Sequence, residues 1–106
     1  MNIALLEGIN METFLNNPKL FEESAEILKA LSHPVRLCIA KGLLDSGSSN
    51  VTTMQICLDM PQSTISQHVA KLKSSGIISG ERNGLEIIYK VSNEKVARVI
   101  KALFEE

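Results

Sequence analysis

The 106-residue chain has no tryptophan, and aromatic residues make up only 4% of it. It therefore lacks the exposed aromatic platforms on which single-strand nucleic-acid binders stack bases. Two cysteines, Cys38 and Cys57, are too few for a disulfide framework. No apolar run is long enough to cross a bilayer, and the N-terminus does not have the pattern of a secretory signal. We expect a soluble, cytoplasmic chain with no membrane partner.

The sequence also lacks the motifs of common catalytic and metal sites. It has no glycine-rich phosphate loop, nucleophile elbow or paired-carboxylate pattern, so we do not expect an enzyme. Its two histidines, His33 and His68, are too far apart to form a metal-ligand signature. We expect no cofactor and no bound metal.

One segment, residues 62–75, contains no acidic residue. Ile65, Val69 and Leu72 form a narrow apolar stripe at helical spacing, which predicts a helix that faces the core on one side. Its other faces carry amides, hydroxyls and lysines, the groups that contact base edges and phosphates. The predicted DNA-binding residues of this helix are Gln62, Ser63, Thr64, Ser66, Gln67, His68, Lys71 and Lys73.

The formal net charge of −1 conceals an asymmetry along the chain. Residues 62–101 hold seven cations and three acids, a net charge of +4, whereas residues 1–61 hold four cations and seven acids. The positive charge coincides with the predicted DNA-binding helix. A near-neutral total is therefore compatible with nucleic-acid binding.

The apolar pattern predicts further helices before this segment. Pro18 suits a first helical position, and the first clear helix is expected over residues 18–31. Ser32 is the expected N-cap of a second helix, whose core-facing row is Val35, Cys38, Ile39, Gly42 and Leu43. Thr52 or Thr53 is expected to cap a short third helix that turns Met54, Cys57 and Leu58 inward. Residues 53–75 therefore have the order of a helix-turn-helix. A short helix and a tight turn precede the helix whose exposed faces are polar.

A β-hairpin and a final helix are predicted after it. Gly76 is a typical helix-ending glycine. Asn83-Gly84 separates two β-prone runs in residues 77–91 and predicts a hairpin turn with Arg82 and Asn83 at its tip. These two residues join the predicted DNA contacts. Residues 93–104 have near-ideal helical spacing of apolar residues.

The expected fold is mostly α with a small β-hairpin (α+β): a single winged helix-turn-helix domain spanning residues 1–106. Residues 1–17 are interpreted as an N-terminal arm or helix. The first and last apolar helices have more apolar surface than a domain of this size can bury. A second subunit is the natural place for the remainder.

Three stretches resemble the ArsR/SmtB family of bacterial repressors. The first, Leu28-Lys29-Ala30-Leu31-Ser32-His33-Pro34-Val35-Arg36-Leu37, resembles the start of that family's second helix. The second is Gln62–Val69 with Leu72, followed by Ser75-Gly76-Ile77-Ile78, and resembles the recognition helix and its exit. The third, Ile88-Tyr89-Lys90-Val91, resembles the wing. The resemblance implies a homodimer joined through its first and last helices that binds an imperfect inverted repeat of double-stranded DNA. It also implies release by an inducer, which the sequence does not identify. The Cys-Xaa-Cys and last-helix ligands of the family's metal sensors are missing here, which disfavours those metals.

Roles within the predicted interface follow from side-chain chemistry. The amide of Gln67 can pair with adenine, and Ser63 and Thr64 lie at the phosphate-favouring end of their helix. Lys71 and Lys73 are expected on phosphates. His68 is interpreted as a structural or phosphate-facing histidine, and His33 as a capping or packing residue.

Two alternatives remain open from the residues. One is a repressor that senses thiols or oxidants through Cys38 and Cys57, although both are expected to be buried and poorly reactive. The other is a winged-helix protein-interaction module that does not bind DNA.

Overall fold

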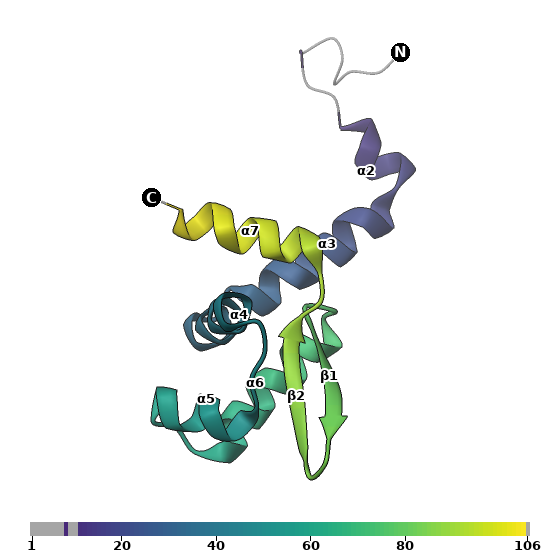
Figure 1. The fold of residues 1–106 in the computed structure, drawn as a ribbon. Coiled ribbons are helices and arrows are strands. Elements are labelled where there is room, and N and C mark those ends of the chain that lie inside the picture. The colour runs from purple at the N-terminus through teal and green to yellow at the C-terminus, as the bar shows by residue number, and fades with distance from the viewer. Residues whose placement is uncertain (1–7, 9–10, 106) are drawn as a thin grey trace.

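The computed structural model describes residues 8 and 11–105, which contain six helices and one β-hairpin (Figure 1). Of the predicted N-terminal arm or helix, residues 1–17, residues 1–7 and 9–10 lie outside these described residues. The elements are α2 (Glu12–Asn16), α3 (Pro18–Leu31), α4 (Pro34–Ser46), α5 (Val51–Leu58), α6 (Gln62–Ser74), β1 (Ile78–Asn83), β2 (Glu86–Val91) and α7 (Glu94–Phe104).

Asparagine side chains cap three of the helices. Oδ1 of Asn17, Asn50 and Asn93 accepts a hydrogen bond from the backbone N–H three residues later, at 3.3, 2.8 and 3.2 Å. Each bond satisfies a first-turn amide that has no partner inside its helix. The prediction that Thr52 or Thr53 caps α5 is therefore wrong: the N-cap is Asn50, two or three residues earlier than expected.

The N-cap of α4 also differs from the prediction. His33 Nδ1 accepts the Val35 N–H at 3.1 Å, whereas Ser32 ends the preceding helix and donates its hydroxyl to the Lys29 carbonyl at 2.8 Å. Pro34 occupies the first turn of α4 and leaves the Val35 amide as the donor to be capped. The predicted capping role of His33 is confirmed, and the one given to Ser32 is wrong.

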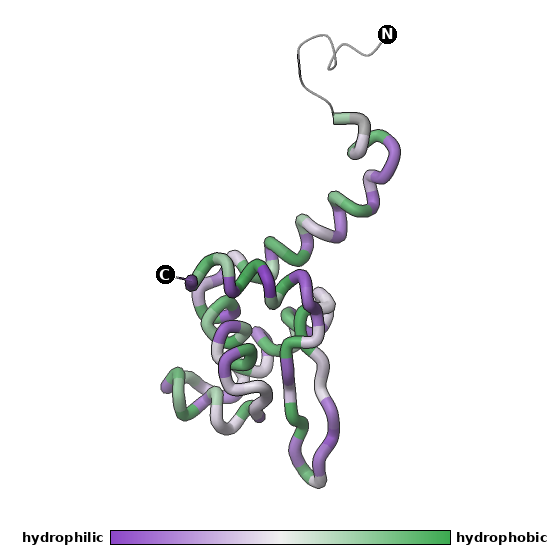
Figure 2. Tube along the Cα trace, turned by 45° about the horizontal axis from the view of Figure 1, so that its top comes forward, coloured by the Kyte–Doolittle hydropathy of each residue, from purple (hydrophilic) through white to green (hydrophobic). Residues whose placement is uncertain are grey.

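One hydrophobic core joins α3, α4, α5, α6, the hairpin and α7. Figure 2 shows where hydrophobic residues lie along these elements. The predicted stripe of α6 is confirmed, since Ile65, Val69 and Leu72 are all buried. The buried residues of the whole core are Ala30, Leu31, Ile39, Ala40, Leu43, Met54, Ile65, Val69, Leu72, Ile77, Ile78, Tyr89, Val96 and Ile100.

The predicted inward row of α4 is only partly correct. Ile39 and Leu43 are buried, whereas Cys38 and Gly42 are exposed. The core-facing side of the helix is centred about one residue further round, on Ile39, Ala40 and Leu43. Because α5 packs mainly on α6 and has few contacts with α4, the side of α4 that carries Cys38 and Gly42 is left exposed among the described residues.

The hairpin is antiparallel and pairs Asn83 with Glu86, so its two-residue turn is Gly84-Leu85. Gly84 has a φ of 68°, as a turn with glycine at its first central position requires. The predicted turn, Asn83-Gly84, is thus displaced by one residue, and Asn83 ends β1. Ser49 and Tyr89 exchange two backbone hydrogen bonds, of 3.0 and 2.8 Å, which attach the hairpin to the loop before α5.

The molecule is elongated, with extents of 60 × 30 × 21 Å. Its radius of gyration, 17.3 Å, exceeds the value of about 13 Å usual for a domain of this length. The cause is the projection of α2 and the start of α3 away from the body (Figure 1). Within the described residues, no helix combines the length and apolar character needed to cross a membrane.

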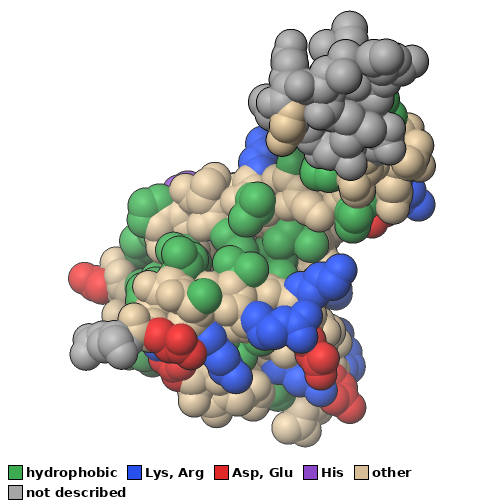
Figure 3. Space-filling model, turned by 90° about the horizontal axis from the view of Figure 1, so that it is seen from above, with side chains coloured by type: hydrophobic (Ala, Val, Ile, Leu, Met, Phe, Trp, Pro, Cys, Tyr) green, Lys and Arg blue, Asp and Glu red, His purple; other side chains and the backbone are tan. Residues whose placement is uncertain are grey.

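The face formed by α3 and α7 is strongly apolar (Figure 3). α7 buries Val96 and Ile100 but leaves its other apolar side chains in solvent. The exposed large apolar residues of these two helices are Leu20, Phe21, Leu28, Val99, Leu103 and Phe104.

Candidate nucleic-acid interface

Helix α6 presents the polar residues predicted to contact DNA. Its buried stripe holds it to the core, which leaves Gln62, Ser63, Ser66 and Gln67 exposed and Thr64 half-buried. The hairpin tip lies at the same end of the molecule as α5 and α6, opposite α7 and the projecting N-terminal segment (Figure 1). The fold therefore brings the predicted helix contacts and wing contacts to one end.

The N-terminus of α6 is open to an anion. Pro61 is its N-cap and makes no side-chain capping bond, and the first turn contains no acid. The amides of a helix's first turn have no intrahelical partner and carry partial positive charge. Ser63 and Thr64 add hydroxyl donors at this end, so a phosphate oxygen is a chemically suitable ligand.

The two lysines of α6 differ in their surroundings. Lys71 Nζ lies 3.8 Å from Glu26 Oε2 of α3, and its side chain is partly covered. Lys73 is exposed, and none of the salt bridges formed among residues 11–105 includes it. Residues 62–75 contain no acid, but the fold brings Glu26, which lies 45 positions before Lys71 in the sequence, next to this helix. Sequence reasoning missed Glu26 because nothing local links it to Lys71.

His68 packs against His33, the N-cap residue of α4. It is half-buried, and its ring centroid lies 4.5 Å from that of His33, with an interplanar angle of 47°. Burial lowers the pKa of His68, and the nearby His33 and Arg36 lower it further. The neutral imidazole is therefore favoured, which makes His68 a poor electrostatic partner for phosphate.

Arg82 and Asn83 are both exposed at the end of β1, next to the Gly84-Leu85 turn. The side chain of Leu85 is fully exposed. On β2, Glu86 is held by a 2.7 Å hydrogen bond from the Asn50 side chain. Arg82 is the cation closest in sequence to the Gly84-Leu85 turn.

Cys38 and Cys57 are free thiols, and both are exposed, contrary to the expected burial. They line one pocket between α4 and α5. No group of three or more histidine, cysteine or acidic side chains suited to a metal ion occurs among the described residues.

This combination of a polar-fronted second helix, an open helix N-terminus and a β-hairpin wing that exposes Arg82 defines a winged helix-turn-helix protein of the DNA-binding type. A comparison with models of protein families finds no match. Individual relatives are more informative. The transcriptional repressor PagR of Bacillus anthracis is 43% identical over 82 residues, which cover 77% of this chain and 82% of PagR.

Solved structures agree with the sequence relatives. The crystal structure of PagR superimposes with a TM-score of 0.74 and 41% identity, covering 80% of this chain and 97% of that one. The solution structure of a homodimeric winged helix-turn-helix DNA-binding domain from Mycobacterium bovis, a possible ArsR-family regulator, gives a TM-score of 0.76 at 29% identity. It covers 82% of this chain and 80% of that domain.

The repressor SmtB of Mycobacterium tuberculosis is 33% identical over 82 residues, 77% of this chain and 60% of SmtB. This chain belongs to the ArsR/SmtB family of transcriptional repressors.

Proposed function

We propose that this protein is a homodimeric, sequence-specific repressor of transcription that binds an imperfect inverted repeat and is released by an inducer. The observation that carries the proposal is the joint placement of the acid-free α6 surface, its open N-terminus and the Arg82 wing at one end of the molecule. On this proposal the protein acts in the cytoplasm and is not an enzyme.

The dimer would form through the apolar face of α3 and α7. Six large apolar side chains on these helices are exposed in the single chain, which costs solubility unless a partner covers them. A twofold axis through this face would place the two α6 helices on the same side of the dimer. They would then enter successive major grooves, about 34 Å apart along the duplex.

Within each half-site, the side chains divide into base readers and phosphate contacts. Gln67, exposed one turn into α6, is assigned to a base edge, since its amide can make two hydrogen bonds with adenine. Ser63 and Thr64, with the helix N-terminus, are assigned to a phosphate. Lys73 and Arg82 are assigned to the backbone on either side.

Selection of binding sequences from a randomised duplex pool, followed by titration of the winning duplex, tests the function. We expect an inverted repeat to be recovered and its affinity to fall steeply with salt, with a log–log slope of about −5 for about six phosphate contacts. Lys73→Ala should reduce the steepness of that slope by about 1, because one counterion-releasing contact is lost.

The matched control is Lys95→Ala, which removes an exposed lysine from α7, the helix opposite the wing tip (Figure 1). It should leave the slope unchanged. Recovery of no sequence, or binding that does not respond to salt, would refute the proposed function.

A further inference from the structure

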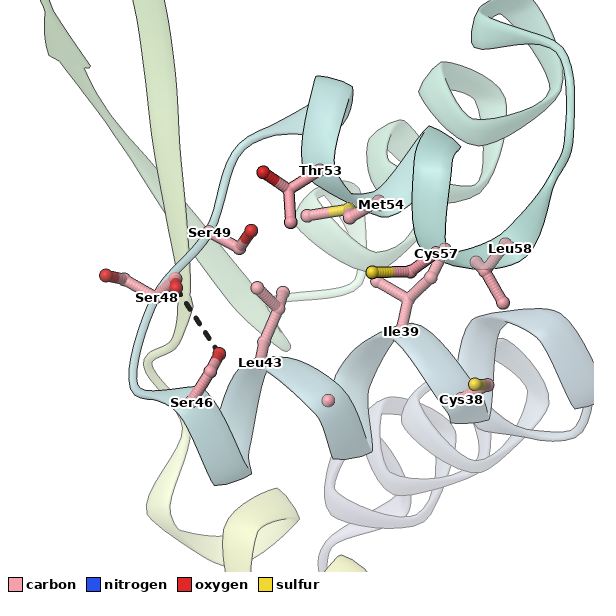
Figure 4. A pocket seen from close by; sticks show the side chains of 11 residues that line it. Cys38, Ile39, Leu43, Ser46, Ser48, Ser49, Thr53, Met54, Cys57 and Leu58 are labelled. Carbon is pink, nitrogen blue, oxygen red and sulfur yellow. Dashed lines mark hydrogen bonds between the residues drawn. The ribbon is translucent and has the colours of Figure 1, made fainter.

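The pocket between α4 and α5 is a separate feature of the fold, with a volume of about 450 Å³ (Figure 4). That volume lies in the range of small-molecule sites, about 300–1,000 Å³. Its wall is largely apolar, with Ile39 and Leu43 from α4 and Met54 and Leu58 from α5. Serine and threonine hydroxyls line the end nearest the loop between the two helices (Figure 4).

None of the residues that line this pocket is charged. An ionic ligand would lose its hydration there without gaining a counter-charge, which is unfavourable. An uncharged molecule with an apolar body would instead be stabilised, because its apolar surface would leave water and contact Ile39, Leu43 and Met54. The wall chemistry thus selects for neutral ligands.

Two nucleophilic side chains share this uncharged pocket. Cys38 and Cys57 are both free and exposed, and the sulfur of Cys57 is directed over Ile39 into the pocket (Figure 4). A thiol beside a bound apolar molecule reacts faster than a thiol in bulk solvent, because binding holds the two reacting atoms together. Exposure of the sulfur satisfies the access that such a reaction needs.

We propose that this pocket binds small, neutral electrophiles of the quinone class and that Cys57 forms a covalent adduct with them. The sulfur lone pair forms an S–C bond to a ring carbon of the quinone. The thiol proton and the displaced ring proton end on the two ring oxygens. The quinone becomes a substituted hydroquinone attached to Cys57; no group leaves, and no external oxidant is consumed.

The adduct would act on the DNA-binding end through α5. That helix packs mainly on α6 and only weakly on α4, so α5 can move away from α4 and change its packing on α6, which the core holds in place. A ring held between α4 and α5 stabilises the arrangement in which α5 is displaced. Because DNA binding favours the undisplaced arrangement, the adduct weakens DNA binding. This regulatory part of the proposal rests on the proposed function. Formation of the adduct on Cys57 does not depend on the proposed function.

The chemical test compares two electrophiles, 2-methyl-1,4-benzoquinone and a sulfonated benzoquinone, by intact-protein mass spectrometry. Rates are normalised to those of each compound with N-acetylcysteine. The neutral quinone should react faster by about ten-fold, the factor expected when about 60 Å² of apolar surface leaves water. Cys57→Ser should abolish the fast reaction, whereas its matched control, Cys38→Ser, should retain it.

Filling the pocket provides a second, independent variant. Gly42 lies one helical turn after Cys38 and lines the pocket, and a Cβ built on it meets no atom within 4 Å. Gly42→Leu should therefore fold and remove the preference for the neutral quinone while both thiols remain. Gly42→Ala, which adds a single methyl group, should keep most of that preference.

Equal normalised rates for the two quinones, adduct formation on Cys38 alone, or an unchanged preference in Gly42→Leu would each overturn the pocket assignment. The regulatory part is tested by titrating the duplex selected from the randomised pool with quinone-treated protein. The affinity of the treated protein for this duplex should be at least ten-fold lower than that of untreated protein. Unaltered affinity of a fully labelled protein would overturn regulation. Failure of untreated protein to bind any duplex would instead overturn the proposed function, with the adduct result unaffected.

Discussion

The imidazole of His68 on α6 packs against the imidazole of His33, which is itself the N-cap of α4, with 4.5 Å between ring centroids. The contact connects the helix assigned to DNA with the start of the core helix α4. His33 Nδ1 accepts the Val35 amide, which fixes the His33 ring at the first turn of α4. Arg36 adds positive charge beside the pair and donates to the Ala30 carbonyl at 2.7 Å.

Stability should therefore fall on mild acidification. Because burial, and then the nearby His33 and Arg36, lower the pKa of His68 in the folded protein, the unfolded chain takes up the proton first as pH decreases. The contribution is complete above the ordinary histidine pKa of about 6.5 and is lost progressively below it. Urea unfolding at pH 7.5 and pH 5.5 measures this, and His68→Gln should show a smaller loss than the natural protein. A loss of equal size in both would exclude His68 as its source.

The ion pair between Lys71 and Glu26 should compete with DNA. Both side chains are more than one third exposed, so the pair contributes little to folding, but it occupies a cation beside the proposed phosphate path. Glu26→Gln should free Lys71 for a phosphate and steepen the log–log salt slope by about 1. Salt titrations by fluorescence anisotropy report the slope. Glu23→Gln, which breaks the exposed pair with Lys19 on the same helix, serves as the control and should have no effect.

Removal of the Gln67 amide should reduce discrimination between duplexes. Gln67→Ala is expected to weaken binding to the selected duplex by about 1–3 kcal/mol, the value of a bidentate base contact, while binding to unrelated duplexes is unchanged. Competition titrations with both duplexes provide the ratio. An equal loss on the two duplexes would assign Gln67 to the phosphate backbone instead.

A charge on the apolar face of α7 should prevent dimer formation. Leu103 is 61% exposed in the single chain. In a symmetric dimer, Leu103→Glu would affect two copies and cost about 3–6 kcal/mol of apolar burial. Sedimentation at micromolar concentration should then find a monomer. Leu85→Glu makes the same change at the fully exposed wing tip and should leave a dimer; a dimer in both variants would place the interface elsewhere.

The wing should not tolerate a side chain at Gly80. A Cβ there would lie 2.8 Å from both Ile87 Cγ2 and Tyr89 Cε1, and the Tyr89 ring is buried against the core. Gly80→Ala should lower the free energy of unfolding by about 1–3 kcal/mol, the usual cost of overpacking. Urea denaturation measures that value, and Gly42→Ala is the contrasting substitution, because the space beside Gly42 is open. Equal stability of the two variants would contradict the close approach in the wing.

Much of the fold could be predicted because its signals are local. The period of Ile65, Val69 and Leu72 correctly indicated which side of α6 is buried, and Gly76, with a φ of 75°, follows the end of that helix as expected. The hairpin was correctly placed but its turn was one residue out, since both Asn83 and Gly84 suit a turn and strand pairing decides between them. The N-cap of α5 was misassigned, and the N-cap of α4 was given to Ser32 although His33 was also named for capping, because several polar residues near each start can accept the bond.

By itself, the sequence determined the order of elements, the acid-free polar surface of α6 and the surplus of apolar residues in the first and last helices. These follow from residue types at helical or strand spacing, which act over one or two turns. Only the tertiary structure brought Glu26 to Lys71, His33 to His68, and Cys38 to the same pocket as Cys57. Those pairs are distant along the chain, and the packing angle between helices, which no local pattern encodes, decides whether they meet.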